Sequence, residues 1–231
     1  MDLKLFYHVT DLPGWEDITN EQMIRLKNSG LLDNCELHVN LHFNPNSFDQ
    51  LRDEWKNYQN IVWYYSKYKK EDWELPTYVL MQQTALKTNK EFYALYFKQK
   101  AINYYERQAG KDWRRLLDWF LIDNWRHMVA KLDEGCYDVV GINRKSDHWS
   151  GSSAWCTASF LRRCRPILGV GGDPGIGYKS QLGRDSYKHD VEYYFAWNND
   201  RYYSFFDSAP ANHYIDEFPE EKYKNFFKDN L

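Results

Sequence analysis

Two neighbouring stretches of the sequence, YDVVGIN at 137–143 and HWSGSSAW at 148–155, indicate how this chain folds. The first is a short apolar run and predicts a buried strand, while the second predicts a polar, aromatic loop that leads into a helix. In an open α/β sheet, ligands bind in the crevice outside the carboxyl ends of the strands. A loop that carries His, Trp, Ser and Gly can hydrogen-bond a polyol and stack on its ring. We therefore expect a ligand site at this loop.

On both sides of these stretches, predicted strands alternate with predicted helices. The strands are expected at 3–9, 36–43, 61–65, 91–97 and 137–142. The helices are expected at 19–30, 48–58, 76–86, 112–134, 155–165 and from 219 onward. The alternation predicts one α/β domain over 1–231 with a mostly parallel, doubly wound sheet. Two aromatic runs, 193–197 and 201–206, predict a C-terminal hairpin.

The composition excludes several classes of protein. Of the 231 residues, 43% are hydrophobic and 27% are charged, which is typical of a soluble globular domain. The net charge of −3 argues against a broad nucleic-acid surface. No apolar run approaches the ~20 residues that a membrane span needs, and the N-terminus has no signal-peptide pattern. The four cysteines are scattered, so we expect reduced thiols and a cytoplasmic protein.

Glycine is concentrated in one segment, because six of the 12 glycines lie at 169–183. This segment predicts a mobile loop that acts as a lid or as a flap on the acceptor side. The sequence GDPGIGYKS at 172–180 approaches a phosphate-binding P-loop, but Tyr178 separates the last glycine from the lysine, and no apolar strand precedes it. No Gly-x-Gly-x-x-Gly follows the first strand, so we expect neither a nicotinamide nor a flavin cofactor.

Several short motifs, spread from Tyr7 to about Phe206, carry a family resemblance. In chain order they are Phe6-Tyr7-His8-Val9, Ser29-Gly30-Leu31-Leu32, Glu74-Leu75-Pro76-Thr77, Leu95-Tyr96-Phe97-Lys98-Gln99-Lys100, His148-Trp149-Ser150-Gly151 with Trp155, and Asp190-Val191-Glu192. Together they resemble the small GT-A-type glycosyltransferases of large algal (chlorella) viruses and of bacterial polysaccharide loci. The chain departs from the family pattern at Lys98, Ala101, Ser152 and Ala154, where the family has His, Gly, Asn and Trp.

The resemblance implies a GT-A-like (Rossmann-like) fold and an inverting transfer of a sugar from a nucleoside diphosphate, with UDP the expected nucleotide, to a glycan or glycoprotein acceptor. An inverting transfer needs a carboxylate base, and we expect Glu192, with Asp190 as the second candidate, because it follows the glycine-rich segment and precedes a predicted strand. The donor-binding residues that the resemblance implies are His8, Val9, Thr10, Glu74, Thr77, Lys98, Lys100, His148, Ser150, Gly151 and Trp155. Structural roles remain open for several of these residues: a salt bridge for Glu192, a loop-bracing hydrogen bond for His148, core packing for Trp155, and helix capping for Glu74 and Thr77.

The strand end at 97–100 reads FKQK and carries no carboxylate. Many GT-A enzymes hold Mn²⁺ or Mg²⁺ there with Asp-x-Asp, and the ion stabilises the departing diphosphate. A lysine ammonium group can neutralise a phosphate directly. We therefore expect Lys98 or Lys100 to replace part of the role of the metal, name no metal ligand, and leave open whether the protein uses a divalent ion. Surface lysines without a ligand role are the alternative.

Two other functions remain open. A non-catalytic carbohydrate-binding domain on a degenerate GT-A fold would explain the missing Asp-x-Asp. An interaction module that kept the fold would use its exposed aromatic side chains for a partner. Nucleotide binding separates the glycosyltransferase from the interaction module, and turnover separates it from the carbohydrate-binding domain.

Overall fold

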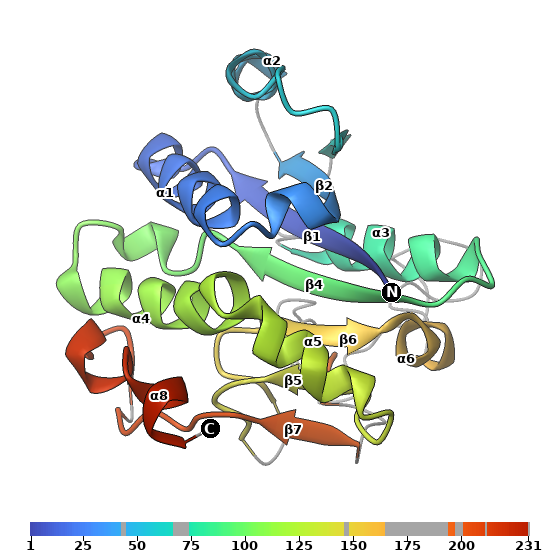
Figure 1. Cartoon of the computed structure of the whole chain (residues 1–231). Coiled ribbons are helices and arrows are strands. Elements are labelled where there is room, and N and C mark those ends of the chain that lie inside the picture. Colours follow the sequence, from blue (N-terminus) through green and yellow to red (C-terminus); the bar gives the residue numbers. More distant parts are fainter. Residues whose placement is uncertain are drawn as a thin grey trace, which may run out of the picture.

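The computed structural model describes residues 1–42, 45–66, 74–145, 148–164, 194–196, 201–210 and 212–230. These residues form a mixed α/β protein around a seven-stranded sheet with the order β3-β2-β1-β4-β6-β5-β7 (Figure 1). The strands are β1 (Asp2–Thr10), β2 (Cys35–His42), β3 (Ile61–Ser66), β4 (Phe92–Lys98), β5 (Val139–Gly141), β6 (Ala154–Thr157) and β7 (Tyr202–Ser204).

The α-helices are α1 (Trp15–Asn28), α2 (Pro45–Glu54), α3 (Leu75–Leu86), α4 (Gln108–Asp118), α5 (Trp125–Asp133), α6 (Ala158–Arg163) and α8 (Phe226–Asn230). Shorter helical turns are η1 (Leu32–Asn34), η3 (Ile102–Tyr104), the π-helical η4 (Trp119–Asp123) and η5 (Glu220–Lys222). None of the helices described here has the length and apolarity that crossing a membrane requires.

The sheet is mostly parallel. The strands β1, β2, β3 and β4 pair in parallel, with His8 of β1 opposite Asn40 of β2 and Lys98 of β4. Only β6 runs against its neighbours β4 and β5 within the described sheet, and β5 pairs in parallel with β7. The predicted fold class is confirmed in its architecture, a mostly parallel central sheet flanked by helices.

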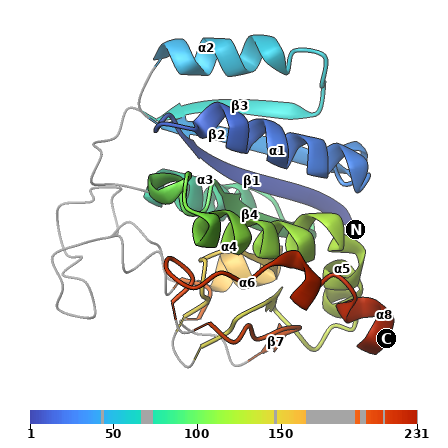
Figure 2. The ribbon, with the colours of Figure 1, turned by 90° about the vertical axis from the view of Figure 1, so that its left-hand side faces the viewer.

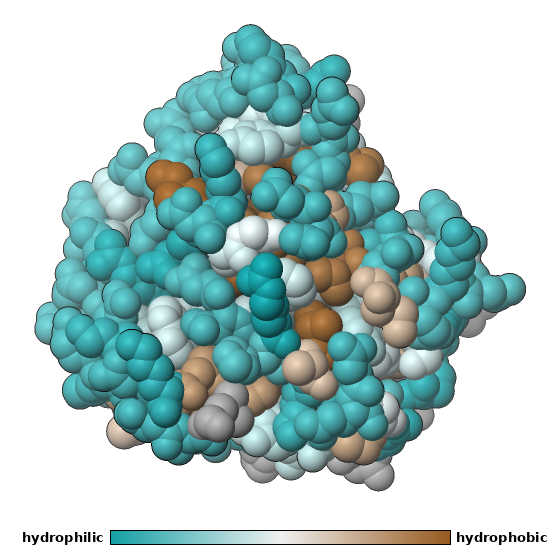
Figure 3. Space-filling view, in the orientation of Figure 1, coloured by the Kyte–Doolittle hydropathy of each residue, from teal (hydrophilic) through white to brown (hydrophobic). Residues whose placement is uncertain are grey.

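Alternate residues of the strands feed two apolar cores, one on each face of the sheet. One core joins Leu5, Tyr7 and Val9 of β1 to α1, α4 and α5. The other joins Phe6 of β1 and Tyr96 of β4 to α3 and α6. The face of the molecule in Figure 3 is mostly hydrophilic and its apolar patches are small, as expected when both sheet faces are covered by helices.

In the C-terminal half of the chain, one predicted element is wrong and one strand was not predicted. The predicted hairpin is not formed, because 194–196 make a turn and β7 pairs in parallel with β5. The aromatic run misled the prediction because Tyr194 and Phe195 pack against Tyr78 of α3, and not across a strand pair. The strand β6 was also missed, since the sequence predicted that the loop at 148–155 leads directly into a helix.

The long helix predicted at 112–134 is interrupted. Its apolar stripe is buried as expected, but the π-helical turn η4 separates α4 from α5. Asn124 ends this turn, because its backbone N–H and its side-chain amide both donate to the carbonyl of Trp119 (3.1 and 2.9 Å). The interruption leaves the carbonyl of Leu121 to accept the indole N–H of Trp155 (2.9 Å). The break therefore anchors β6 to the helical layer.

A buried polar chain ties α1 to the end of α4. The Tyr7 hydroxyl donates to Gln22 Oε1 (2.6 Å), and Gln22 Nε2 donates to Asp118 Oδ1 (2.9 Å) and to the carbonyl of Lys98 (3.2 Å). Burial raises the pKa of Asp118 to about 7, although the hydrogen bond from Gln22 and the charge of Arg25 act to lower it. The carboxyl group is therefore protonated in the folded chain over a pH range in which an exposed aspartate is ionised.

The change Asp118→Asn should flatten the pH dependence of stability between about pH 4 and 7. In this window the unfolded wild-type chain releases the proton that the folded chain keeps, so the free energy of unfolding falls as pH rises. The variant has no such proton, and its stability should rise relative to the wild type across the window. Urea unfolding at pH 4.5, 6 and 8 measures this, with the exposed Asp53→Asn as control. Parallel curves for the wild type and Asp118→Asn would contradict the assignment.

Candidate functional site at the ends of β1 and β4

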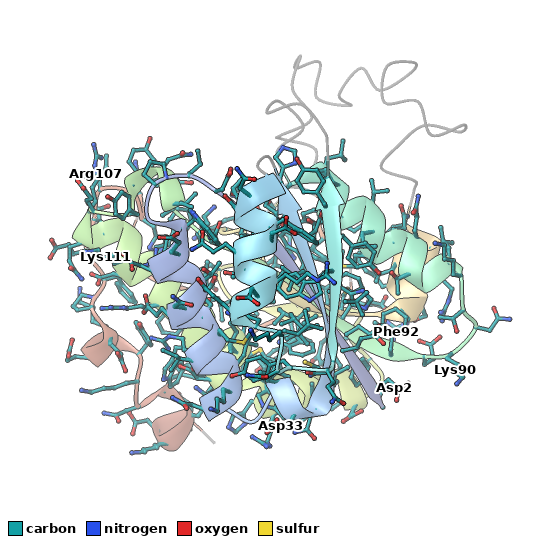
Figure 4. The ribbon with its side chains drawn as sticks, turned by 90° about the horizontal axis from the view of Figure 1, so that it is seen from above. Asp2, Asp33, Lys90, Phe92, Arg107 and Lys111 are labelled. Carbon is teal, nitrogen blue, oxygen red and sulfur yellow. The ribbon has the colours of Figure 1, made fainter. Side chains whose placement is uncertain are left out.

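The order of the strands indicates where a ligand crevice is expected. From β1 the chain winds outward through β2 and β3, and it then returns to place β4 on the other side of β1. Such a switch point opens a crevice at the carboxyl ends of the two strands. Figure 2 shows this order of the strands, from β3 at the top through β2 and β1 to β4. In Figure 4, Asp2 and Phe92, which begin β1 and β4, lie at one end of the molecule, and Arg107 and Lys111 at the start of α4 lie at the other.

On the α3 side of the crevice, Lys98 forms an ion pair with Glu74. Lys98 Nζ contacts Glu74 Oε1, and the Tyr96 hydroxyl donates to Glu74 Oε2 (2.9 Å). Lys98 is 9% exposed. Glu74 immediately precedes α3, but its side chain makes no capping hydrogen bond. The capping role considered for Glu74 is therefore wrong, and its carboxylate neutralises Lys98 instead.

The pKa values of this pair follow from burial and charge. Burial alone raises the pKa of the Glu74 carboxyl, but the charges of Lys98 and Lys100 outweigh it and hold this pKa below its usual value. Burial lowers the pKa of Lys98, with Glu74 opposing and Lys100 adding to the effect. Lys100 therefore contributes to the potential on both members of the pair.

Lys100 lies on the α4 side of the same turn. Its ammonium group is 4.2 Å from the ring centroid of Trp113 and 5.7 Å from that of Tyr214, and the residue is 6% exposed. Ala101 follows with φ of 60°, a left-handed conformation that glycine adopts more readily than alanine. The two lysines predicted as donor contacts thus flank the end of β4 from opposite sides.

At the end of β1, only some of the predicted contacts face the crevice. His8 Nδ1 is hydrogen-bonded to Thr77 Oγ1 (2.8 Å), which also accepts from Asn40 Nδ2 (2.9 Å). Burial lowers the pKa of His8 to about 3, so this ring is neutral at physiological pH. The side chain of Val9 belongs to the core under α1, so the predicted donor contact of Val9 would have to come from its backbone. Thr10 ends the strand, and its backbone N–H is held by the side chain of Gln99 (2.8 Å).

The loop that prompted the site prediction adjoins β4, because Ala154 at the start of β6 pairs with Tyr96. Gly151 has φ of 99°, which favours glycine, and a Cβ there would also lie 2.8 Å from Leu117 Cδ1. The backbone N–H of Ser150 donates to the carbonyl of Asn143 (3.0 Å). The carbonyl of His148 accepts from the backbone N–H of Lys145 (2.8 Å). These bonds hold the loop closed on itself.

Trp155 is a core residue. It lies in β6 with no exposed surface, and its indole N–H is used by the carbonyl of Leu121. The ring has no free face for a sugar, so the predicted stacking role is wrong. Strand β6 alternates its side chains between the two cores, and this alternation directs Trp155 into the core under α4 and α5.

The remaining predictions lie outside the described residues. These are the catalytic candidates Glu192 and Asp190 and the glycine-rich segment 169–183. Within the described part of the chain, no group of three or more His, Cys, Asp or Glu side chains could hold a metal ion. At the end of β4, the carboxylate of Glu74 is taken up by Lys98 and Tyr96. The residues of this turn do not fit Mn²⁺ or Mg²⁺, and its positive charge comes from lysine.

Three polar residues of the crevice were missed in the sequence: Asn40, Ser66 and Gln99. Ser66 Oγ donates to Asn40 Oδ1 (2.7 Å), and Asn40 in turn reaches Thr77. The signal for Asn40 was present, because polar and apolar residues alternate along 36–42 and predict one polar strand face. Gln99 gives no such signal, since the target of its side chain is backbone from a distant segment.

Comparison with known proteins gives no matching family model and no matching curated protein. Among solved structures, two crystal structures of TarS 1–349 from S. aureus are similar to the chain, one of them in complex with UDP. The sequence identity is 12% in both cases, and the TM-scores are 0.43 and 0.42. The similarity covers 75% of this chain and 53% of the TarS chains, so this chain spans about half the length of the structures that it matches.

The ion pair of Glu74 and Lys98 should behave as a single unit in unfolding experiments. Glu74→Gln leaves a buried cation without its anion and should cost about 3 kcal/mol of stability, and Lys98→Met should have a similar cost. The double variant should lose much less than the sum, because both charges are gone. Urea unfolding of all four proteins gives the coupling energy.

The matched control is the more exposed pair Lys4 and Glu36 (2.6 Å), for which the same cycle should give less than about 1 kcal/mol. Additive losses at Glu74 and Lys98 would show that the two groups do not depend on each other.

Proposed function

We propose that the protein is a glycosyltransferase that binds a nucleoside diphosphate sugar in the crevice between β1 and β4. The observation that carries this proposal is the turn 98–100, which presents two lysines at the switch point of the sheet, one on each side. Topology predicts a ligand at this edge. Lysine charge there favours an anion, and the diphosphate is the anionic part of such a donor.

The two lysines have different roles in this proposal. Lys98 carries a charge that Glu74 already balances, so the pair is close to neutral. Lys100 lies beside aromatic rings, with its ammonium group 4.2 Å from the ring centroid of Trp113 and 5.7 Å from that of Tyr214. A charge in such a poorly hydrated place acts more strongly than one in bulk water. Lys100, together with Lys98, is therefore a candidate to stabilise the charge that develops on the leaving diphosphate.

The nucleoside half of the donor would lie at the end of β1. His8, Asn40 and Thr77 form a buried hydrogen-bonded polar cluster there, with a neutral imidazole ring. UDP is the expected nucleotide because of the family resemblance, and a glycan or glycoprotein is the expected acceptor. Glu192, with Asp190 as the second candidate, is the proposed base that takes the proton of the acceptor hydroxyl in an inverting transfer.

A non-catalytic carbohydrate-binding module is the second candidate function. The neutralisation of Lys98 by Glu74 favours it, because this contact halves the positive charge of the turn. The burial of Trp155 counts against it, because a carbohydrate-binding site would need such a ring exposed. An assay of sugar transfer distinguishes the two functions, since only the glycosyltransferase turns over a donor.

Calorimetric titration with UDP and then GDP, with and without Mn²⁺, tests the proposal. The wild type should bind UDP in the micromolar range without the metal ion. Lys100→Met should weaken UDP binding about tenfold, the effect of losing roughly 1.4 kcal/mol of charge–phosphate interaction. Lys90→Met is the matched control, because Lys90 is exposed and precedes β4 at the opposite edge of the sheet (Figure 4). Absence of nucleotide binding in all conditions would overturn the proposal.

A further inference from the structure

The side chain of Gln99 joins the two halves of the crevice. Gln99 follows β4 directly and is 3% exposed. Its Oε1 accepts the backbone N–H of Thr10 (2.8 Å), and its Nε2 donates to the backbone carbonyl of Trp15 (3.1 Å). One amide thus binds both ends of segment 10–15, which leads from β1 into α1.

This connection takes over where the sheet ends. The pairing of β1 with β4 stops at His8 and Lys98, so no strand ladder holds Thr10 against the chain after β4. The Gln99 amide supplies the next two hydrogen bonds to backbone in place of the ladder. Without Gln99, the backbone N–H of Thr10 and the backbone carbonyl of Trp15 would lose these hydrogen bonds.

The turn that carries Gln99 is itself fixed. The carbonyl of Lys98 accepts from the backbone N–H of Lys100 (2.8 Å) and from Gln22 Nε2 (3.2 Å). The carbonyl of Lys100 accepts from Arg114 Nη1 (3.4 Å). Because the turn is anchored to α1 and α4, Gln99 sets the position of segment 10–15 relative to both lysines.

We propose that Gln99 is a positioning residue that sets the distance between the nucleoside end and the diphosphate end of the donor site. The inference rests on the proposed function. A ligand that spans both ends gains affinity because binding one half presents the other half at its site. This gain requires the two ends to keep a fixed separation, and beyond the last β1–β4 pair the Gln99 amide links them directly.

The variant Gln99→Met tests this, because methionine has similar length and lacks both hydrogen bonds. The readout is the affinity for uridine, for pyrophosphate and for UDP, measured by calorimetry or by ligand-observed NMR where binding is weak. Gln99→Met should lose about tenfold in UDP affinity and less than about twofold for uridine and for pyrophosphate. A residue with a general structural role would weaken all three ligands together.

Gln50→Met is the matched control. The Gln50 amide also crosses between elements, since its Nε2 donates to Glu16 of α1 (2.9 Å), but it is exposed and lies on α2. It should bind all three ligands like the wild type. Should Gln99→Met fail to fold, Gln99→Glu replaces it: the carboxylate can accept from Thr10 but cannot donate to Trp15, so an intermediate loss for UDP alone is expected.

The outcomes separate the inference from the proposed function. Wild-type UDP affinity in the Gln99 variants, or an equal loss for all three ligands, would overturn the positioning role and leave the donor site in place. Failure of the wild type to bind UDP would overturn the proposed function, and the positioning role with it.

Discussion

The parallel pairing of β1 with β4 is the constraint on which the rest of this structure depends. It joins segments that are about 90 residues apart in the chain, with Asp2 opposite Phe92 and His8 opposite Lys98. It also forces the chain to cross over between the two strands, and such a crossover leaves an open edge where backbone and side-chain groups have no strand partner. The polar groups that gather at the edge follow from this geometry.

The polar groups described at this edge are connected to one another by ion pairs and hydrogen bonds. Glu74 balances Lys98, Thr77 accepts from Asn40, and Gln22 connects Tyr7 to Asp118. Buried polar groups must be satisfied in this way, because each missing hydrogen bond costs about 1–3 kcal/mol. A network with few free partners is also rigid, which suits a site that must hold a charged ligand in one geometry.

The sequence predicted the architecture better than the site. Periodicity located β1 to β4 and their helices, because each of these elements buries a regular apolar face. Periodicity failed at β6, because this strand is four residues long and follows a loop, and so short a strand shows no repeat. It also failed at the turn 194–196, where aromatic residues pack on α3. Local pattern could not reveal either of these tertiary contacts.

For the site, the sequence predicted which residues gather at the sheet edge better than it predicted what each of them contacts. Lysine at 98 and 100, histidine at 8 and threonine at 77 do meet at the expected edge. Their partners could not be inferred, since Glu74 reaches across to β4 although its position indicates a helix cap. Gln99 is the clearest case, because it acts on backbone atoms 84 and 89 residues away in the chain.

A crystal structure of the chain with UDP tests the central claim most directly. The account predicts the diphosphate within contact distance of Lys100 Nζ and the nucleoside beside Thr10, in the crevice between β1 and β4. UDP bound at any other edge of the sheet, or bound with its phosphates away from the turn 98–100, would contradict it.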